Sequence, residues 1–197
     1  MSKKTRIKLK AYNAKEKMGN QYHIQINDFS ISDFNLLIGD NAQGKTRLLR
    51  MLNYISSLFT GRPRAIATTL ETTFRFDQIS GKERHQITYK LHVQPQNGRN
   101  IFKEIIVKNG KKIFSTAEKL LYDETESKNI KEFFFPRDRP AILSIDDPKF
   151  ATIKLIREFF QRVIYISSSK NRDLIMASDE VVPNSEGTNV NWVLNNW

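Results

Sequence analysis

Eight residues of this 197-residue chain have the types and the spacing of a phosphate-binding loop. The segment Gly39-Asp40-Asn41-Ala42-Gln43-Gly44-Lys45-Thr46 fits the pattern G-x-x-x-x-G-K-[ST]. Its two glycines allow the backbone to approach an anion, so that N–H groups and the positive end of a following helix surround a β-phosphate. In this pattern Lys45 reaches the β- and γ-phosphates and the Thr46 hydroxyl coordinates Mg²⁺. We therefore expect ATP and Mg²⁺ as cofactors, held by these residues and by the backbone amides from Asn41 to Arg47.

The segments on either side of the loop predict the elements that must position it. The apolar run Phe34-Asn35-Leu36-Leu37-Ile38 is typical of a buried strand. A helix is expected from Thr46 to Phe59, because apolar residues recur along it at helical spacing. A strand, a glycine turn and a helix in this order are the context that a phosphate-binding loop requires.

The sequence around the loop also resembles a known family. NLLIGDNAQGKTRLLRML, residues 35–52, is similar to the nucleotide-binding segment of the RecF/SMC-like branch of ABC-type, AAA-family ATPases. In that branch a Gly-[Asp/Glu]-Asn-[Ala/Gly]-[Gln/Ser]-Gly-Lys-Thr loop precedes a Leu-Leu pair. RecF proteins continue with Glu-Ala-Ile where this chain has Arg50-Met51-Leu52, which favours a broader RecF-like or AAA-type relative. Residues 163–168 and 186–194 resemble a later passage of such ATPase heads, a strand followed by Gly-[Ser/Thr]-Asn.

This resemblance implies both a fold and a function. The implied fold is an α/β P-loop NTPase, the N-terminal lobe of an ABC-type head, with a mixed sheet and an inserted antiparallel β subdomain. The implied function is ATP binding and hydrolysis in DNA maintenance, repair or defence against foreign DNA. Hydrolysis would need a second lobe or a homodimer partner, because a Ser-Gly-Gly signature helix has to meet the γ-phosphate from the far side. A glutamine loop is also implied, and Gln78 and Gln86 are its candidates.

Alternation of apolar and polar residues predicts several strands. Strands are expected at 6–11 and 22–26, and an antiparallel β subdomain is expected at about 72–115. Within it Asn109-Gly110 is a strong hairpin signal. A buried strand is expected at 162–167.

Two further helices are expected near polar capping residues. Ser115 and Glu118 have the spacing of a capping box, which predicts a short helix through Leu121. An exposed connector is expected at 123–131. A longer helix is expected after Asp147, with Pro148 at its first position.

Catalysis would need an acidic pair at the end of an apolar strand, to hold the Mg²⁺ shell and to polarise water. Asp146 and Asp147 are the candidate pair, at the end of the segment AILSIDDP, residues 141–148. We favour the competing interpretation, in which Asp147 caps the following helix, because Ser144 interrupts the run and no Ser-Gly-Gly segment occurs in the sequence. The catalytic residues therefore stay unknown.

Alternatives remain open at this point. The chain stops about where the family's head would continue, so it is a fragment, one half of a split gene or a degenerate module. One rival function is a self-contained P-loop kinase or NTPase that uses Asp146 or Asp147. Another is a basic nucleic-acid-binding module with a vestigial loop.

Length and composition limit the remaining possibilities. A chain of this length is expected to form a single nucleotide-binding domain, residues 1–197. The formal charge of +11 suits a polyanion such as DNA as a partner. The absence of cysteine excludes disulfides and thiolate chemistry, and the three histidines, His23, His85 and His92, show no metal-ligand spacing.

The N-terminal residues and the hydropathy of the chain indicate where the protein is located and which N-terminal side chains are exposed. No apolar run is long enough to span a membrane, and no secretory signal is visible, so a cytoplasmic protein is expected. The basic run Lys3 to Lys10 alternates with apolar residues, which favours the exposed face of an edge strand over a dedicated DNA contact.

Overall fold

The structure, a computed structural model, describes residues 5–19, 21–31, 45–60, 66–130 and 134–162. Its chain divides into two compact units. The first unit comprises residues 1–36 and 64–157, and the second comprises residues 37–63 and 158–197.

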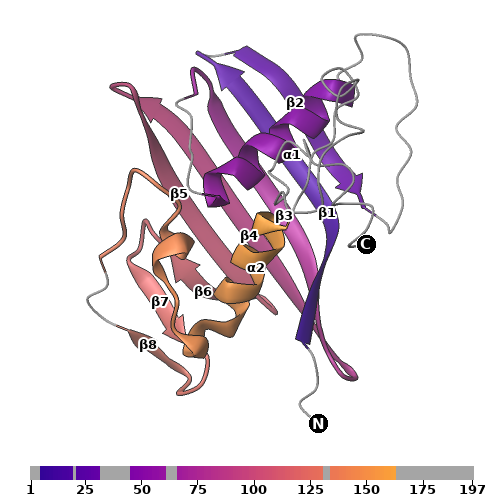
Figure 1. Cartoon of the computed structure of the whole chain (residues 1–197), viewed down its shortest axis with the longest axis vertical. Coiled ribbons are helices and arrows are strands. Elements are labelled where there is room, and N and C mark those ends of the chain that lie inside the picture. Colours follow the sequence, from indigo (N-terminus) through magenta and orange to yellow (C-terminus); the bar gives the residue numbers. More distant parts are fainter. Residues whose placement is uncertain (1–4, 20, 32–44, 61–65, 131–133, 163–197) are drawn as a thin grey trace, which may run out of the picture. The chain divides into compact units, whose positions relative to one another are not determined.

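The first unit contains an antiparallel sheet of eight strands among the described residues (Figure 1). The order across the sheet is β2-β1-β3-β4-β5-β6-β7-β8. The strands are β1 (Thr5–Met18), β2 (Gln21–Ser30), β3 (Thr69–Ser80), β4 (Glu83–Gln96), β5 (Arg99–Lys108), β6 (Lys111–Ser115), β7 (Leu120–Asp123) and β8 (Lys128–Ile130).

The α/β fold expected from the family resemblance is contradicted by this arrangement. Every described strand pair is antiparallel, and the described residues form only two α-helices, α1 (Lys45–Phe59) and α2 (Ala151–Gln161). An antiparallel eight-stranded sheet with two helices is not the N-terminal lobe of a P-loop NTPase. The strands expected at 34–38 and 163–167 lie outside the described residues, and Arg162 lies in a turn.

Short connections explain why the sheet is antiparallel. Turns of a few residues join successive strands from β3 to β8, and such turns can only produce antiparallel neighbours. The long connection from β2 to β3 contains α1, but β1 lies between these two strands and pairs with both. No parallel pair therefore results from that crossover.

The strands expected at 6–11 and 22–26 and the antiparallel region expected at 72–115 are confirmed, and the sheet continues beyond them. β1 and β2 cover the expected strands at 6–11 and 22–26, and β3 to β6 cover the expected antiparallel region. Asn109 and Gly110 form the turn between β5 and β6 with φ angles of 49° and 79°, which suits an Asn-Gly hairpin turn. The Asn109 side chain also accepts a hydrogen bond from the Gln86 backbone N–H at 2.9 Å.

The short helix expected after Ser115 is absent, and β7 occupies its end. The Ser115 hydroxyl accepts the Glu118 backbone N–H at 3.3 Å, so the local capping contact does form. Lys119 then adopts a left-handed φ of 51°, which ends the turn. Leu120 and Leu121 pair with β6 instead, and Leu121 becomes fully buried. The expected connector at 123–131 likewise contains β8.

One face of the sheet carries the core of the first unit. Phe74, Tyr89 and Ile106 have no exposed surface and lie on adjacent strands in register. The Tyr12 ring stacks on Phe74 with ring centres 4.9 Å apart. We call the opposite side of β1 to β5 the open face; its side chains are half-buried or exposed, in alternation with those of the core face.

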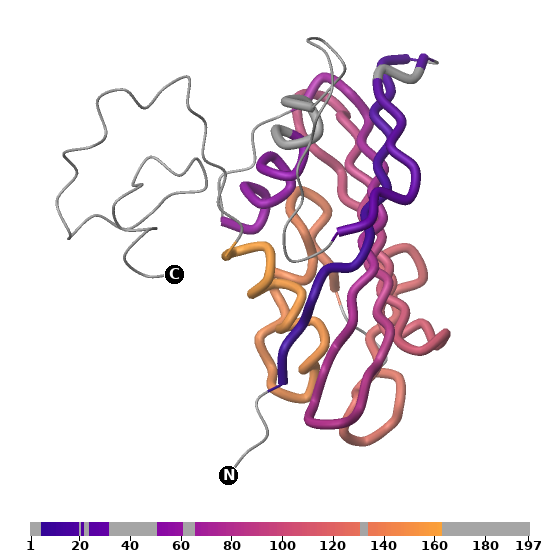
Figure 2. The backbone as a smooth tube through the Cα atoms, turned by 90° about the vertical axis from the view of Figure 1, so that its right-hand side faces the viewer, coloured from indigo at the N-terminus to yellow at the C-terminus, as the bar shows by residue number. Residues whose placement is uncertain are grey.

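The segment after β8 returns to the core face. It forms two short 3-10 helices, η1 (Ala141–Ser144) and η2 (Pro148–Phe150), before α2. Figure 2, a side view, shows this orange segment on one side of the sheet. The Thr152 hydroxyl lies 3.5 Å from the Gln78 side chain of β3, on the core face. The expected helix after Asp147 is confirmed.

Candidate functional site

The phosphate-binding pattern meets the described residues at the start of α1. Residues 39–44 lie outside the described residues, as do the side chains of Lys45, Thr46 and Arg47. The backbone of α1 begins at Lys45, directly after Gly44. A helix of 15 residues thus begins where the pattern requires one, and its first turn offers unpaired N–H groups.

The other end of α1 is anchored within the second unit. The Ser56 hydroxyl donates to the backbone carbonyl of Phe160 at 2.7 Å. The Phe59 ring stacks on the Phe160 ring with centres 4.6 Å apart and an interplanar angle of 13°. The Gln161 side chain donates to the Phe59 carbonyl at 3.4 Å. These contacts hold the C-terminal end of α1 in place.

Asp147 is a capping residue and Asp146 is an ion-pair partner, and neither ends a strand. The preceding residues form the 3-10 helix η1. Asp147 accepts the Lys149 backbone N–H at 3.0 Å, and this bond lowers the pKa of its carboxyl group. Asp146 is paired with Arg157, whose hydrogen bond lowers the pKa of Asp146. Both carboxylates therefore already have structural partners.

The two candidates for the glutamine loop lie within strands. Gln78 lies within β3 and is buried on the core face beside Thr152. Gln86 lies within β4 and is exposed. Neither lies in a loop, so neither matches the expected glutamine loop.

Metal-ligand clustering is not found in the described part of the chain. His85 contacts the Asn109 side chain at 2.9 Å and lies 3.7 Å from Glu83. His92 is half-buried on the open face, where burial is the main cause that lowers its pKa. The side chain of His23 lies outside the described residues.

A buried carboxylate, which the sequence patterns did not single out, joins the sheet to η1. Glu104 has no exposed surface. It accepts the Tyr89 hydroxyl at 2.8 Å and the Ala141 backbone N–H. Burial raises the pKa of Glu104 to about 7, although its hydrogen bonds act in the opposite direction. The sequence did carry a signal for this residue, because Glu104 is a charged residue at a core position of β5, between Phe102 and Ile106.

A hollow of about 510 Å³ lies on the open face, and we call it the sheet hollow. One row of its lining crosses four strands in register: Lys15 on β1, Glu71 on β3, His92 on β4 and Lys103 on β5. Lys90 lies in the adjacent row. Three of the lining side chains are therefore lysines.

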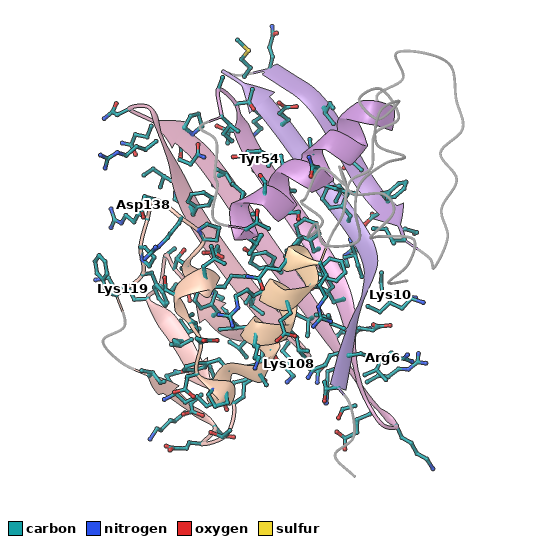
Figure 3. The ribbon with its side chains drawn as sticks, viewed as in Figure 1. Arg6, Lys10, Tyr54, Lys108, Lys119 and Asp138 are labelled. Atoms are coloured by element: carbon teal, nitrogen blue, oxygen red, sulfur yellow. The ribbon has the colours of Figure 1, made fainter. Side chains whose placement is uncertain are left out.

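A second hollow, of about 560 Å³, lies beside the part of β5 that does not pair with β6, and we call it the edge hollow. Its lining includes Lys103, Lys119, Arg137 and two aromatic residues, Phe134 and Phe135. The Phe102 backbone N–H donates to the Arg137 carbonyl at 3.0 Å, which fixes this segment beside β5. Figure 3 shows Lys119 projecting from the β6–β7 side of the sheet, whereas Lys108 lies near α2.

Comparisons with known proteins leave the chain without an assigned family. No family model, no curated protein and no solved structure matches it. The described helices include none long and apolar enough to cross a membrane.

Proposed function

We propose that this chain binds Mg²⁺ and ATP through residues 39–47. The observation that carries the proposal is the position of α1: it begins at Lys45, within a G-x-x-x-x-G-K-[ST] sequence. The first turn of a helix provides unpaired N–H groups and a partial positive charge, both of which favour phosphate. Lys45 and Thr46 would then supply the cation for the phosphates and the Mg²⁺ ligand.

We further propose that hydrolysis requires residues from a partner. Asp146 and Asp147 are engaged as helix-capping and ion-pairing groups, which leaves no candidate acidic pair among the described residues. A loop that holds nucleotide without a positioned water and without charge on the far side of the γ-phosphate lacks most of the transition-state stabilisation. A second ATPase lobe or a homodimer partner would supply both, as in the RecF/SMC-like ATPases that residues 35–52 resemble.

A nucleic acid is the proposed macromolecular partner, in DNA maintenance, repair or defence. The net charge of +11 supports it, as does the concentration of lysines on the open face. No base-reading motif is visible, so phosphate contacts are expected to dominate the affinity.

Calorimetric titration with Mg-ATP tests the nucleotide proposal. We expect the unmodified chain to bind and Lys45→Ala to lose binding, because the charge beside the β- and γ-phosphates is removed. Lys82→Ala, an exposed lysine in the turn between β3 and β4, is the control for the loss of one positive charge. Equal affinity in all three proteins would refute the assignment of the loop.

A further inference from the structure

The sheet hollow and the edge hollow share lining residues, and we treat them together as one basic groove. Both are lined by Lys103 and Ala117, and their other linings extend from that junction in different directions. The sheet hollow reaches Lys15 on β1, and the edge hollow reaches Arg137. Neighbouring strands lie about 4.8 Å apart, so the row from Lys15 to Lys103 alone spans roughly 14 Å.

We propose that this groove binds single-stranded nucleic acid, with a base stacked on Phe134. This inference rests on the nucleic-acid part of the proposed function and is independent of ATP binding. Five cationic side chains line the groove: Lys15, Lys90, Lys103, Lys119 and Arg137.

Acidic side chains along the groove are few and already engaged. Glu71 forms an ion pair with Lys17 at 3.4 Å, and Glu104 is buried against Tyr89. Within the described segments, Lys90, Lys103, Lys119 and Arg137 form no ion pair. Asp138 is exposed beside Arg137 in the sequence but does not line either hollow. The groove therefore presents a surplus of positive charge to an anionic chain.

Phe134 distinguishes this groove from a general basic surface. Its side chain is 87% exposed, whereas Phe135 beside it is 7% exposed and packs edge-on against Phe114. An exposed phenyl ring beside cations is the combination that binds unpaired bases, since every base has a face that can stack. A duplex offers no such face along its length.

His92 adds a neutral polar group to the floor of the sheet hollow. Its Nε2 atom is buried and has no hydrogen-bond partner among the described residues. The charged groups around it are Glu71, Lys103 and Lys17. A ligand that enters the hollow can supply the missing partner.

The test measures binding of a fluorescent single strand of about 16 nucleotides, as oligodeoxythymidine and as oligouridine, against a duplex of equal length. Lys90→Glu/Lys103→Glu reverses two charges within the groove. Lys82→Glu/Lys154→Glu makes the same change in net charge at exposed positions in the β3–β4 turn and on α2. Thermal melting followed by circular dichroism verifies that each variant is folded.

We expect the groove variant to bind at least about tenfold more weakly than the matched variant, because only its charges face the strand. Phe134→Ala should weaken single-strand binding by about 5- to 150-fold and leave duplex binding unchanged. Phe134→Leu keeps the apolar volume without the ring and should show a similar loss. Binding of either oligodeoxythymidine or oligouridine agrees with the inference.

Three outcomes would overturn the inference. These are equal losses in the two double variants, a preference for the duplex, or unchanged single-strand binding in Phe134→Ala. If the first or the third occurs while the unmodified chain still binds DNA, the proposed partner stands and only the groove is wrong. If no nucleic acid binds at all, the proposed partner fails as well, and the ATP titration is unaffected.

Discussion

The hydroxyl of Tyr89 donates a 2.8 Å hydrogen bond to the carboxylate of Glu104 inside the core of the sheet. Both side chains are fully buried. Burial is the main cause that raises the pKa of Tyr89, and the nearby Glu104 carboxylate raises it further. The second carboxylate oxygen of Glu104 accepts the Ala141 backbone N–H, so one acidic group joins β4, β5 and η1.

Glu104→Gln should remove a pH dependence of stability. The pKa of Glu104 rises from 4.5 to about 7 in the folded protein. The folded state therefore binds the proton more tightly, and the stability from this group is complete below pH 4.5 and lost as pH rises through 7. The loss amounts to about 3 kcal/mol, since each pH unit between the two pKa values is worth about 1.4 kcal/mol.

Urea unfolding of both proteins between pH 4.5 and pH 8 measures this effect. As pH rises, the free energy of unfolding of the unmodified chain should fall relative to that of Glu104→Gln. Glu83→Gln, at an exposed position of β4, is the control and should run parallel to the unmodified chain. A parallel curve for Glu104→Gln would show that the buried carboxyl does not titrate in this range.

Asp146→Asn/Asp147→Asn should leave ATP turnover at the background level of the unmodified chain. Asp147 caps η2 and Asp146 pairs with Arg157, so neither is placed to polarise water. The expected effect is a lower melting temperature, because the cap and the ion pair are weakened. Phosphate release is the measurement, with Lys45→Ala for comparison. Clear turnover that disappears in the double variant would identify a self-contained NTPase.

Glu124→Ala should destabilise the attachment of α2 to the sheet by about 2 kcal/mol. The Glu124 carboxylate accepts the Thr152 N–H at 3.0 Å and the Thr152 hydroxyl at 2.9 Å, and it pairs with Lys108 at 2.6 Å. The Lys108 side chain is only 21% exposed and would lose its counter-charge.

Glu118→Ala provides the matched control for that change. Glu118 pairs with Lys112 at the surface, where such a pair contributes less than about 1 kcal/mol. Chemical unfolding of both variants should therefore separate them clearly. Equal effects would mean that Glu124 contributes no more than an ordinary surface charge.

Nucleic-acid affinity should fall steeply with salt. A single strand that contacts the five cations of the groove should show a slope of log affinity against log salt of about −3.5, because each neutralised phosphate contributes about −0.7. Removal of one contact, as in Lys103→Ala, should make the slope less steep by about 0.7. A titration at several salt concentrations measures it, and affinity that does not change with salt would exclude phosphate contacts.

Local signals in the sequence predicted local structure well. The alternation in residues 72–115 and the Asn109-Gly110 pair predicted hairpins, because side-chain period and turn conformation are determined by near neighbours. Asp147 and Pro148 predicted the start of a helical segment for the same reason. These features needed no knowledge of distant residues.

Predictions that depended on distant partners failed or could not be made. The capping contact of Ser115 formed, but Leu121 gained more by burial against β6 in the sheet than a single helical turn could offer. The sequence pattern did not indicate the groove, because the alternation in β4 and β5 identifies only their apolar, buried positions. Lys90 and Lys103 are alternate residues of those strands, and only the register places them on one surface.

The contact between Ser56 and Phe160 joins residues 104 positions apart in the chain. At synthesis rates of about 5–20 residues per second, α1 is complete roughly 5–20 s before Phe160 has been made. The hairpins from β3 to β8 need only their neighbours and can pair during this interval. A nascent chain therefore carries Phe59 for seconds without the ring on which it stacks, so this end of α1 gains its packing partner only late in synthesis.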